Sequence, residues 1–402
     1  MQMQNTEGVM RRDTTEWLPL IALFMVGVFP NGVLLCAPAL GNQLVNEFAF
    51  TPEQLGNFFS LEFCGFAVAG ILGTYVLPRV NWVKLFNFAL FVFVAGYVAS
   101  IFVLPDVRAL MIVQGVTTIF GGCSISLLGL SFSGQVSRPA RGYAMFILGQ
   151  LASGTVGLLV LPWLFQAYGL KAFFVAEVLL ALSMVPFIKW LPATPPSARA
   201  GNRPQASVPF HLLLLGLGTV TAFYYGLASV WTFIGQIGTG IHLTDASIGT
   251  ALAISTVAGM IGSVVVGVLS GRVQAALLIS AGMGAMLLSC VGLVDVRSLA
   301  LFTLSAILFK FAWTFALPPM LEAIAQADET SRLLAFSSSG IGVGLMVGPA
   351  VAGWIISISK GYTAMLLVAA AMCVFAWLGC LTLVRVNRRA TKTGHAGRVA
   401  VR

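Results

Sequence analysis

Long apolar runs separated by short polar segments recur along almost the whole chain. Each run is about as long as an α-helix must be to cross a bilayer, roughly 20 residues. We identify twelve runs, at residues 17–45, 52–77, 82–104, 107–132, 142–167, 171–191, 210–238, 245–270, 273–294, 298–325, 333–357 and 362–384. The pattern predicts an all-α membrane protein with twelve transmembrane helices.

Composition agrees with a membrane environment. Hydrophobic residues make up 58% of the 402 residues and charged residues 9%, whereas a soluble domain carries about 25% charged residues. A cysteine inside a span behaves as a small apolar residue, and no disulfide framework is indicated. All six cysteines fall inside runs: Cys36, Cys64, Cys123, Cys290, Cys373 and Cys380.

Basic residues predict the orientation, because short loops rich in lysine and arginine stay in the cytoplasm. With the N-terminus inside, seventeen of the 22 lysines and arginines lie on the cytoplasmic side, and Lys310 lies within a run. The outer side holds Arg108, Lys171, Arg297 and Lys360. We therefore expect a multi-pass protein of the cell inner (plasma) membrane with both termini cytoplasmic. The net charge of +9 then reflects topology and anionic lipid, and we expect no nucleic-acid partner.

The chain contains an internal duplication. The segment TPEQLGNFFS at Thr51 matches TDASIGTALA at Thr244 at an offset that also pairs Arg79 with Arg272, and DVRAL at 106–110 recurs as DVRSL at 295–299. Each half carries six runs in the same orientation. The predicted organisation is an N-terminal six-helix bundle (1–190), a cytoplasmic linker (191–209), a C-terminal six-helix bundle (210–385) and a basic cytoplasmic tail (386–402).

Such a repeat is one architecture of secondary transporters, whose substrate site lies near the bilayer midplane. Local motifs point the same way. GVLSGR at 267–272 is similar to part of a loop signature that follows the second helix of each half, and Gln114 with Gly115 matches part of an RxxQG element, with Met111 at the arginine position and Arg108 one turn earlier. On the repeat, the topology and these motifs, the chain resembles the major facilitator superfamily over its whole length.

The resemblance implies two six-helix bundles related by pseudo-two-fold symmetry, alternating access and a monomer. Two departures modify it. The acidic position of the loop signature is Pro78 in one half and Gly271 in the other, which removes the charge-based latch of the family. GLMVGPAVAG at 344–353 resembles the GxxxGP element, but drug-exporting antiporters carry that element in the fifth helix, where this chain has Thr155 at the proline position. The second departure favours uptake over export.

Lys310, in LSAILFKFAW, is the first candidate for chemistry. It lies about 18 Å beyond Ser298 at 1.5 Å per residue, near the middle of a core about 30 Å thick. A lysine there costs about 2.5 to 3.5 kcal/mol on an insertion scale, so we expect it to face a water-filled cavity or an acidic partner. We predict that Lys310, Trp313 and Thr314 bind substrate. A structural ion pair is the alternative.

Glu62 is equally deep in the second run. Gly65, Ala69 and Gly73 follow it at helical spacing, and small residues let another helix approach, so we expect Glu62 to point into protein. A carboxyl removed from water can carry a proton near neutral pH. We predict proton coupling through Glu62. The alternatives are an acid held neutral by hydrogen bonds or one paired with Lys310.

Other polar positions complete the predicted site. The seventh run carries a polar stripe at helical spacing that is expected either to line a wet or ligand-binding face or to hold helices together. The predicted substrate-binding residues from this stripe and from other runs are Tyr225, Ser229, Thr232, Gln236, Asn31, Gln114, Thr118 and Gln150.

Gating positions are predicted at loop charges and at kinks within runs: Arg79, Arg272, Glu322, Pro30 and Pro318. Glu322 is expected to reach a loop arginine. Glu177, in the sixth run, is interpreted as structural, because peripheral helices of the resembling family lie outside the cavity.

The sequence therefore predicts a proton-coupled secondary transporter of a small organic solute, leaning to uptake of an aromatic or aliphatic carboxylate. The alternative is a proton antiporter that exports drugs or metabolites. An enzyme is not expected, because no nucleophile cluster or metal-ligand set occurs. We expect no metal and no cofactor apart from the proton gradient; the expected partners are the solute, protons and the lipid bilayer.

Overall fold

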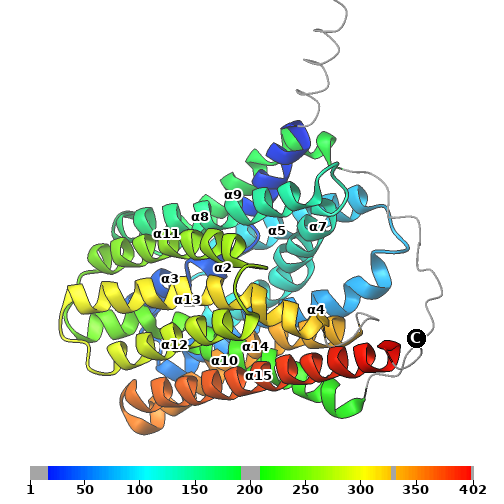
Figure 1. Ribbon diagram of the computed structural model, residues 1–402. Helices are drawn as coiled ribbons and strands as arrows, with labels where there is room; N and C mark the ends of the chain where they lie inside the picture. The colour runs from blue at the N-terminus through cyan, green and yellow to red at the C-terminus, as the bar shows by residue number, and fades with distance from the viewer. Residues whose placement is uncertain (1–16, 192–208, 327–331, 400–402) are drawn as a thin grey trace, which may run out of the picture. The chain divides into compact units, whose positions relative to one another are not determined.

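The computed structural model describes residues 17–191, 209–326 and 332–399. The first sixteen residues and nearly all of the predicted linker 191–209 lie outside this part, as do the last three residues of the predicted tail. The described residues form helices and no strand (Figure 1). The prediction of an all-α protein is confirmed.

Eleven helices of the described chain are long and apolar enough to cross a membrane. Beyond the first run, the elements are α4 (Pro52–Val76), α5 (Trp82–Val103), α6 (Val107–Thr117), the π-helix η1 (Thr118–Gly122), α7 (Cys123–Ser133), α8 (Pro139–Tyr168), α9 (Lys171–Ser183), the 3-10 helix η2 (Val185–Trp190), α10 (Phe210–Gly240), α11 (Asp245–Leu269), α12 (Ala275–Val294), α13 (Leu299–Gln326), α14 (Arg332–Ser359) and α15 (Thr363–Val399).

The first predicted run, 17–45, is not a continuous helix. It consists of the helix Trp17–Val28, the short α2 (Gly32–Leu35) and α3 (Ala37–Phe48). Proline has no N–H to continue a helical ladder, and the first break includes Pro30 and Asn31, the residue that caps α2. Within the described residues none of the three pieces reaches the length of a span, so eleven long helices are found there where twelve runs are predicted.

The duplication is visible in how two equivalent helices begin. Thr51 precedes α4 and its hydroxyl accepts a hydrogen bond from the N–H of Gln54 at 3.2 Å, while the Gln54 side chain accepts from the Thr51 N–H at 2.9 Å. Thr244 precedes α11 and accepts from the N–H of Ser247 at 3.3 Å. Such caps satisfy N–H groups that lack helical partners. The matched threonines of the repeat therefore have the same structural task.

The chain folds as two compact units. Unit 1 comprises Met1–Gln43 and Leu61–Gly201, and unit 2 comprises Leu44–Ser60 and Asn202–Arg402. The division at 201 falls in the predicted linker, but the segment 44–60 belongs to unit 2. There the backbone N–H of Ala350 donates to the Ser60 hydroxyl at 2.8 Å. The start of α4 thus packs on α14 within unit 2.

Within unit 2, α10 packs against α14 and α15, and these helices lie side by side in Figure 1. Three glycines of α14 at four-residue spacing meet α10. A Cβ added at Gly340, Gly344 or Gly348 would lie 2.9, 2.6 or 2.8 Å from a backbone carbonyl oxygen of α10. Helices approach this closely only where small residues repeat.

Within unit 1, the first helix packs against α8 through Gly27 and Gly149. A Cβ on Gly27 would overlap the carbonyl of Phe146, and one on Gly149 would overlap that of Phe24.

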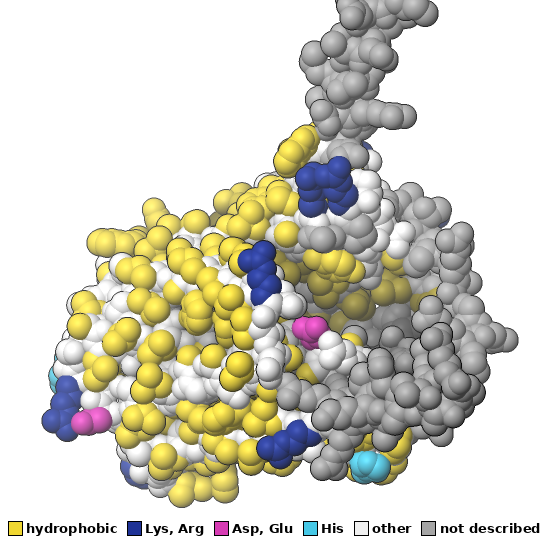
Figure 2. All heavy atoms as spheres, in the orientation of Figure 1, with side chains coloured by type: hydrophobic (Ala, Val, Ile, Leu, Met, Phe, Trp, Pro, Cys, Tyr) yellow, Lys and Arg dark blue, Asp and Glu magenta, His cyan; other side chains and the backbone are white. Residues whose placement is uncertain are grey.

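Hydrophobic side chains cover most of the face seen in Figure 2, and charged side chains on it are few. Large apolar side chains such as Phe91, Phe102 and Val264 are exposed, as expected of helices whose outer surfaces meet lipid.

Candidate functional site

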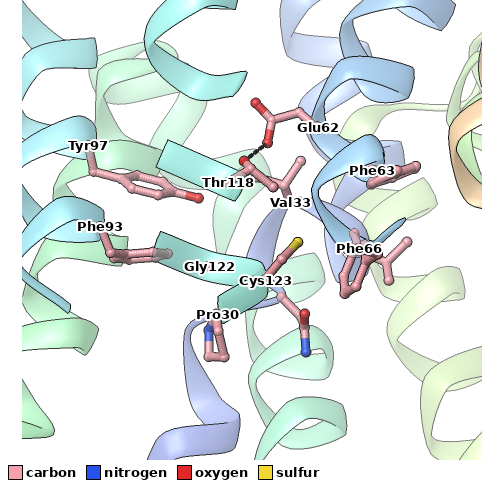
Figure 3. A pocket seen from close by; sticks show the side chains of 12 residues that line it. Pro30, Val33, Glu62, Phe63, Phe66, Phe93, Tyr97, Thr118, Gly122 and Cys123 are labelled. Atoms are coloured by element: carbon pink, nitrogen blue, oxygen red, sulfur yellow. Dashed lines mark hydrogen bonds between the residues drawn. The ribbon is translucent and has the colours of Figure 1, made fainter. Parts of the chain in front are cut away.

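A buried carboxyl site lies in unit 1, where α2, α4, α5 and η1 meet. We call it the glutamate site; its polar groups are Glu62, Thr118, Tyr97 and Asn31, and Cys123 lies among them (Figure 3). Glu62 is 1% exposed. Burial of Glu62 inside protein agrees with the prediction made from the small residues of α4.

Glycines let the elements of the glutamate site come together. A Cβ on Gly65 would lie 2.9 Å from both Cys123 Sγ and the Thr118 side chain, and one on Gly121 would lie 3.0 Å from the backbone of Phe93 on α5. The stretch between α6 and α7 is a π-helix, a rare form that occurs often at functional sites. Its first residue is Thr118, so the irregular turn aims this hydroxyl at Glu62.

Glu62 is held by a single hydroxyl. Thr118 Oγ1 donates to Glu62 Oε2 at 2.5 Å (Figure 3). The other oxygen, Oε1, is buried and has no hydrogen-bond partner among the described residues. A cavity of about 20 Å³ borders the carboxyl, enough for one water molecule. A carboxyl with one free oxygen beside room for water is able to take up and release a proton.

Two predicted cavity residues of unit 1 are engaged with neighbouring helices. Asn31 Oδ1 accepts a hydrogen bond from Ser126 at 2.8 Å, and Gln114 donates to Ser100 on α5 at 2.9 Å. Asn31 borders the small cavity of the glutamate site, whereas Gln114 does not. Gln150 lies half-buried on α8. The structure thus brings Asn31 and Thr118 to Glu62 and leaves Gln114 and Gln150 apart from it.

The lysine site lies in unit 2 and comprises Lys310, Trp313 and Phe309 of α13 with Trp231 of α10. Lys310 is 1% exposed. Its Nζ lies 3.6 Å from the ring centroid of Trp231 and 4.0 Å from that of Trp313. The two indoles meet edge to face, with centroids 6.2 Å apart. The π faces of both rings attract the cation, so two aromatic rings form part of the surroundings of Lys310, and the expected water or acidic partner stays a prediction.

Close packing fixes the position of Lys310. A Cβ on Gly259 of α11 would lie 3.1 Å from the Lys310 side chain. The hydroxyl of Thr314, one turn on, donates to the Gly259 carbonyl at 2.6 Å. The Thr314 hydroxyl therefore links α13 to α11 by a hydrogen bond. The predicted contact of Thr314 with substrate stays a prediction.

The polar stripe of α10 is buried over its whole length. Tyr225, Ser229, Thr232 and Gln236 all lie inside the protein, and the Ser229 hydroxyl donates to the carbonyl of Gly348 on α14 at 3.0 Å. Ser229 thus serves helix packing, one of the two roles proposed for the stripe. Trp231, beside it on α10, supplies an indole of the lysine site.

Of the predicted gating residues, Pro30 borders the cavity of the glutamate site, and the others do not line it. Arg79 is exposed and donates to the carbonyl of Tyr75 at the end of α4, and Arg272 is exposed after α11. Glu322 accepts a hydrogen bond from Gln326 at 3.0 Å. Pro30 lies at the break before α2, whereas Pro318 lies inside the continuous α13. Their roles in gating stay predictions.

Three side chains of interest were not among the predicted site residues. Trp231 and Tyr97 are aromatic residues in apolar runs, and their sequence pattern is that of ordinary core. Glu177, interpreted from the sequence as structural, borders a large cavity. A carboxyl group inside a span is the sequence signal for such a position. No cluster of three or more histidine, cysteine, aspartate or glutamate residues that could hold a metal occurs in the described part of the chain.

A helical protein with many membrane spans, an internal repeat and a buried ionisable group in each unit has the features of a secondary transporter. Comparison with known families identifies which superfamily of transporters this is. The model of the Major Facilitator Superfamily matches residues 21–327 and, separately, 216–401. The chain belongs to this superfamily, and it is a membrane transporter of small solutes rather than an enzyme.

Solved structures of transporters share the fold. A variant of the nucleoside transporter NupG is 13% identical, with a TM-score of 0.71, covering 92% of this chain and 99% of that one. A D-xylose-proton symporter is 14% identical, with a TM-score of 0.69 and coverage of 92% and 98%. A bacterial homologue of the human lysosomal transporter Spinster is 15% identical, with a TM-score of 0.60 and coverage of 94% and 97%. No curated protein matches the sequence significantly. At these identities the likeness concerns the fold alone.

Proposed function

We propose that this transporter carries a small organic anion into the cell together with protons. The observation that carries the proposal is the position of Lys310, whose ammonium is buried against the faces of Trp231 and Trp313. A carboxylate brought to this ammonium would be attracted strongly in a medium of low dielectric constant. The indoles would contact the apolar part of the same molecule. An aromatic or aliphatic carboxylate meets both requirements.

Glu62 is the proposed proton carrier. Its carboxyl is buried, has one hydroxyl donor and borders a cavity the size of a water molecule. Binding or release of a proton at Glu62 changes the net charge of unit 1 by one elementary charge. The proton gradient would then supply the energy, with no other cofactor. The protein would work as a monomer in a bacterial inner membrane with both termini in the cytoplasm.

Proton movement in proteoliposomes tests the proposal. A panel of small carboxylates and a panel of lipophilic cations are added in turn to vesicles that contain the native protein, Lys310→Met or Lys310→Arg. Methionine keeps much of the volume and removes the charge, whereas arginine keeps the charge. We expect inward proton flux with a carboxylate for the native protein, no flux for Lys310→Met, and partial flux for Lys310→Arg.

Lys84→Ala is the matched control, because Lys84 is an exposed lysine whose removal should leave the flux unchanged. Flux with carboxylates that persists in Lys310→Met would show that Lys310 does not recognise the anion. If only the cations move protons, outward for each cation that enters and independently of Lys310, the protein is an exporter and the lysine is a structural charge.

A further inference from the structure

Unit 1 contains a second and much larger cavity, of about 520 Å³, between the first helix, α8 and α9. It shares no lining residue with the cavity of the glutamate site. Three of its lining side chains, Val156, Val160 and Leu179, are 58%, 43% and 63% exposed on the surface of the protein. Because they belong to spanning helices, the cavity opens toward the hydrocarbon of the bilayer. Its size is in the range of pockets for drug-sized molecules.

One carboxyl group lines this apolar cavity. Glu177, on α9, is 5% exposed, and its Oε2 is buried with no hydrogen-bond partner among the described residues. The carboxyl packs directly against Gly32 of α2, where any Cβ would overlap Glu177 Oε1. The nearby hydroxyl of Ser153 donates to the carbonyl of Gln150 at 3.3 Å, so its proton is used elsewhere. The cavity thus presents an acceptor with unused capacity at the base of an apolar space.

The chemistry of a matching ligand follows from these walls. The molecule must be soluble in lipid, because the opening meets hydrocarbon, and it must donate a hydrogen bond to the carboxyl oxygen. A plain acyl chain would leave Oε2 buried and unpaired, which is unfavourable. A fatty acid would place a second carboxyl beside the first. An amine supplies both an apolar body and charge-assisted N–H donors, the strongest class of partner for a carboxylate.

We propose that this cavity binds a lipid-soluble amine, with its apolar body between α8 and α9 and its nitrogen donating to Glu177. This site goes beyond the proposed anion transport and does not depend on it. Glu177 lies six residues into α9 from Lys171, about 9 Å along the helix. The nitrogen of the amine would therefore lie about one and a half helical turns from the start of α9, within the span.

Photolabelling of the full chain tests the site. The protein is reconstituted in nanodiscs of phosphatidylcholine and phosphatidylglycerol, and two probes are compared: decylamine and decanol with the same diazirine in the chain. We expect decylamine to label peptides of α8 and α9 saturably, with competition by unlabelled decylamine. Decanol should label them about tenfold less, because a neutral hydrogen bond replaces a charge-assisted one.

Three variants locate the binding determinant. Glu177→Gln replaces the acid by an amide that cannot form an ion pair with the amine, and should weaken decylamine labelling about tenfold. Ala176→Leu leaves the carboxyl in place but adds bulk to the lining of the cavity, and should also reduce labelling. Ala144→Leu changes an exposed alanine of α8 outside the cavity and should label as the native protein does. Gel filtration and circular dichroism establish that each variant is folded.

Equal labelling by decanol and decylamine, or undiminished labelling of Glu177→Gln, would overturn the proposal and leave a site for neutral chains. Labelling spread over exposed faces without competition would mean ordinary lipid contact. If Glu177→Gln does not fold, Ala176→Leu decides: unchanged labelling there also overturns the proposal. Adding phosphatidylethanolamine to the nanodiscs identifies the source, since suppression of labelling assigns the site to the amine of a lipid and no suppression assigns it to a free amine.

Discussion

At the scale of single residues, Lys310 shows how a buried charge can be tolerated. Insertion of a lysine at the bilayer centre costs about 2.5 to 3.5 kcal/mol, and a desolvated cation–π contact returns about 2 kcal/mol. Two indole faces within 4.0 Å of Nζ therefore offset a cost of this size. The cation–π contacts thus favour a charged ammonium at this buried position.

A double-mutant cycle tests this balance. Lys310→Met and Trp231→Leu are made singly and together, and stability is measured by unfolding in mixed micelles. We expect a coupling energy of about 1 to 2 kcal/mol, because the cation–π contact is present only when both residues are. Effects that simply add would show that Trp231 contributes packing alone. The control is a cycle in which Phe309→Leu takes the place of Trp231→Leu, because the Phe309 ring stacks on Trp231.

Glu62 makes a second prediction at this scale. Glu62→Gln keeps the shape and the bond to Thr118 but cannot exchange a proton. We expect uptake driven by a pH gradient to fall to background, while exchange of substrate across the membrane without a gradient continues. Radiolabelled substrate measures both. Loss of both activities would instead indicate that Glu62 is needed for folding or substrate binding, and unchanged gradient-driven uptake would exclude it as the proton carrier.

The sequence revealed the depth of these two residues but not their neighbours. An apolar run of known length places Lys310 and Glu62 near the middle of a span, and Trp313 follows from helical spacing. Trp231 and Thr118 reach their partners from distant helices, and no local pattern encodes that pairing. The irregular turn at Thr118 also lacks a sequence signature, because its glycines are equally compatible with a regular membrane helix.

At the scale of elements, helix ends were largely predictable and helix interruptions were not. Most observed bounds lie close to the predicted runs, because proline, glycine and charged residues end the apolar stretches. The run 17–45 contains Pro30 and Asn31 within apolar surroundings, and the helix breaks there. Pro318 and Pro319 occur in the continuous α13, so proline alone does not determine a break.

Glycine packing gives a prediction for α10 and α14. Gly344→Val would place a Cβ 2.6 Å from the carbonyl oxygen of Thr221 and force the two helices apart. We expect a loss of about 1 to 3 kcal/mol in the free energy of unfolding, as for other overpacked cores. Thermal unfolding in detergent checks it.

Gly284→Ala is the matched control, because a Cβ there meets nothing within 4 Å. Alanine favours helix over glycine by about 1 kcal/mol in soluble helices, so this variant should be no less stable than the native protein. Equal destabilisation of Gly344→Val and Gly284→Ala would contradict the role of close packing.

At the scale of the whole molecule, the distribution of basic residues predicts the orientation in the membrane. Lys360, between α14 and α15, should face outward, and Arg272, after α11, should face the cytoplasm. Both side chains are exposed, whereas five of the six native cysteines are buried. Cysteine labelling therefore has a low background.

We expect Lys360→Cys to react with a membrane-impermeant maleimide in intact cells, and Arg272→Cys to react only after the cells are permeabilised. Reaction of both in intact cells would contradict an odd number of spans between the two positions. The reverse pattern would place both termini outside. The native protein, treated in the same way, measures the background.

The broken first run has a consequence for biogenesis. The described part of the first helix, Trp17–Val28, is shorter than the roughly 20 apolar residues of a span, and it contacts Phe146 and Gly149 of α8. The nascent chain cannot make these contacts until the ribosome has synthesised α8. The first segment therefore lacks these native contacts while the next helices insert. We expect it to reach its final position only after the fifth predicted span has entered the membrane.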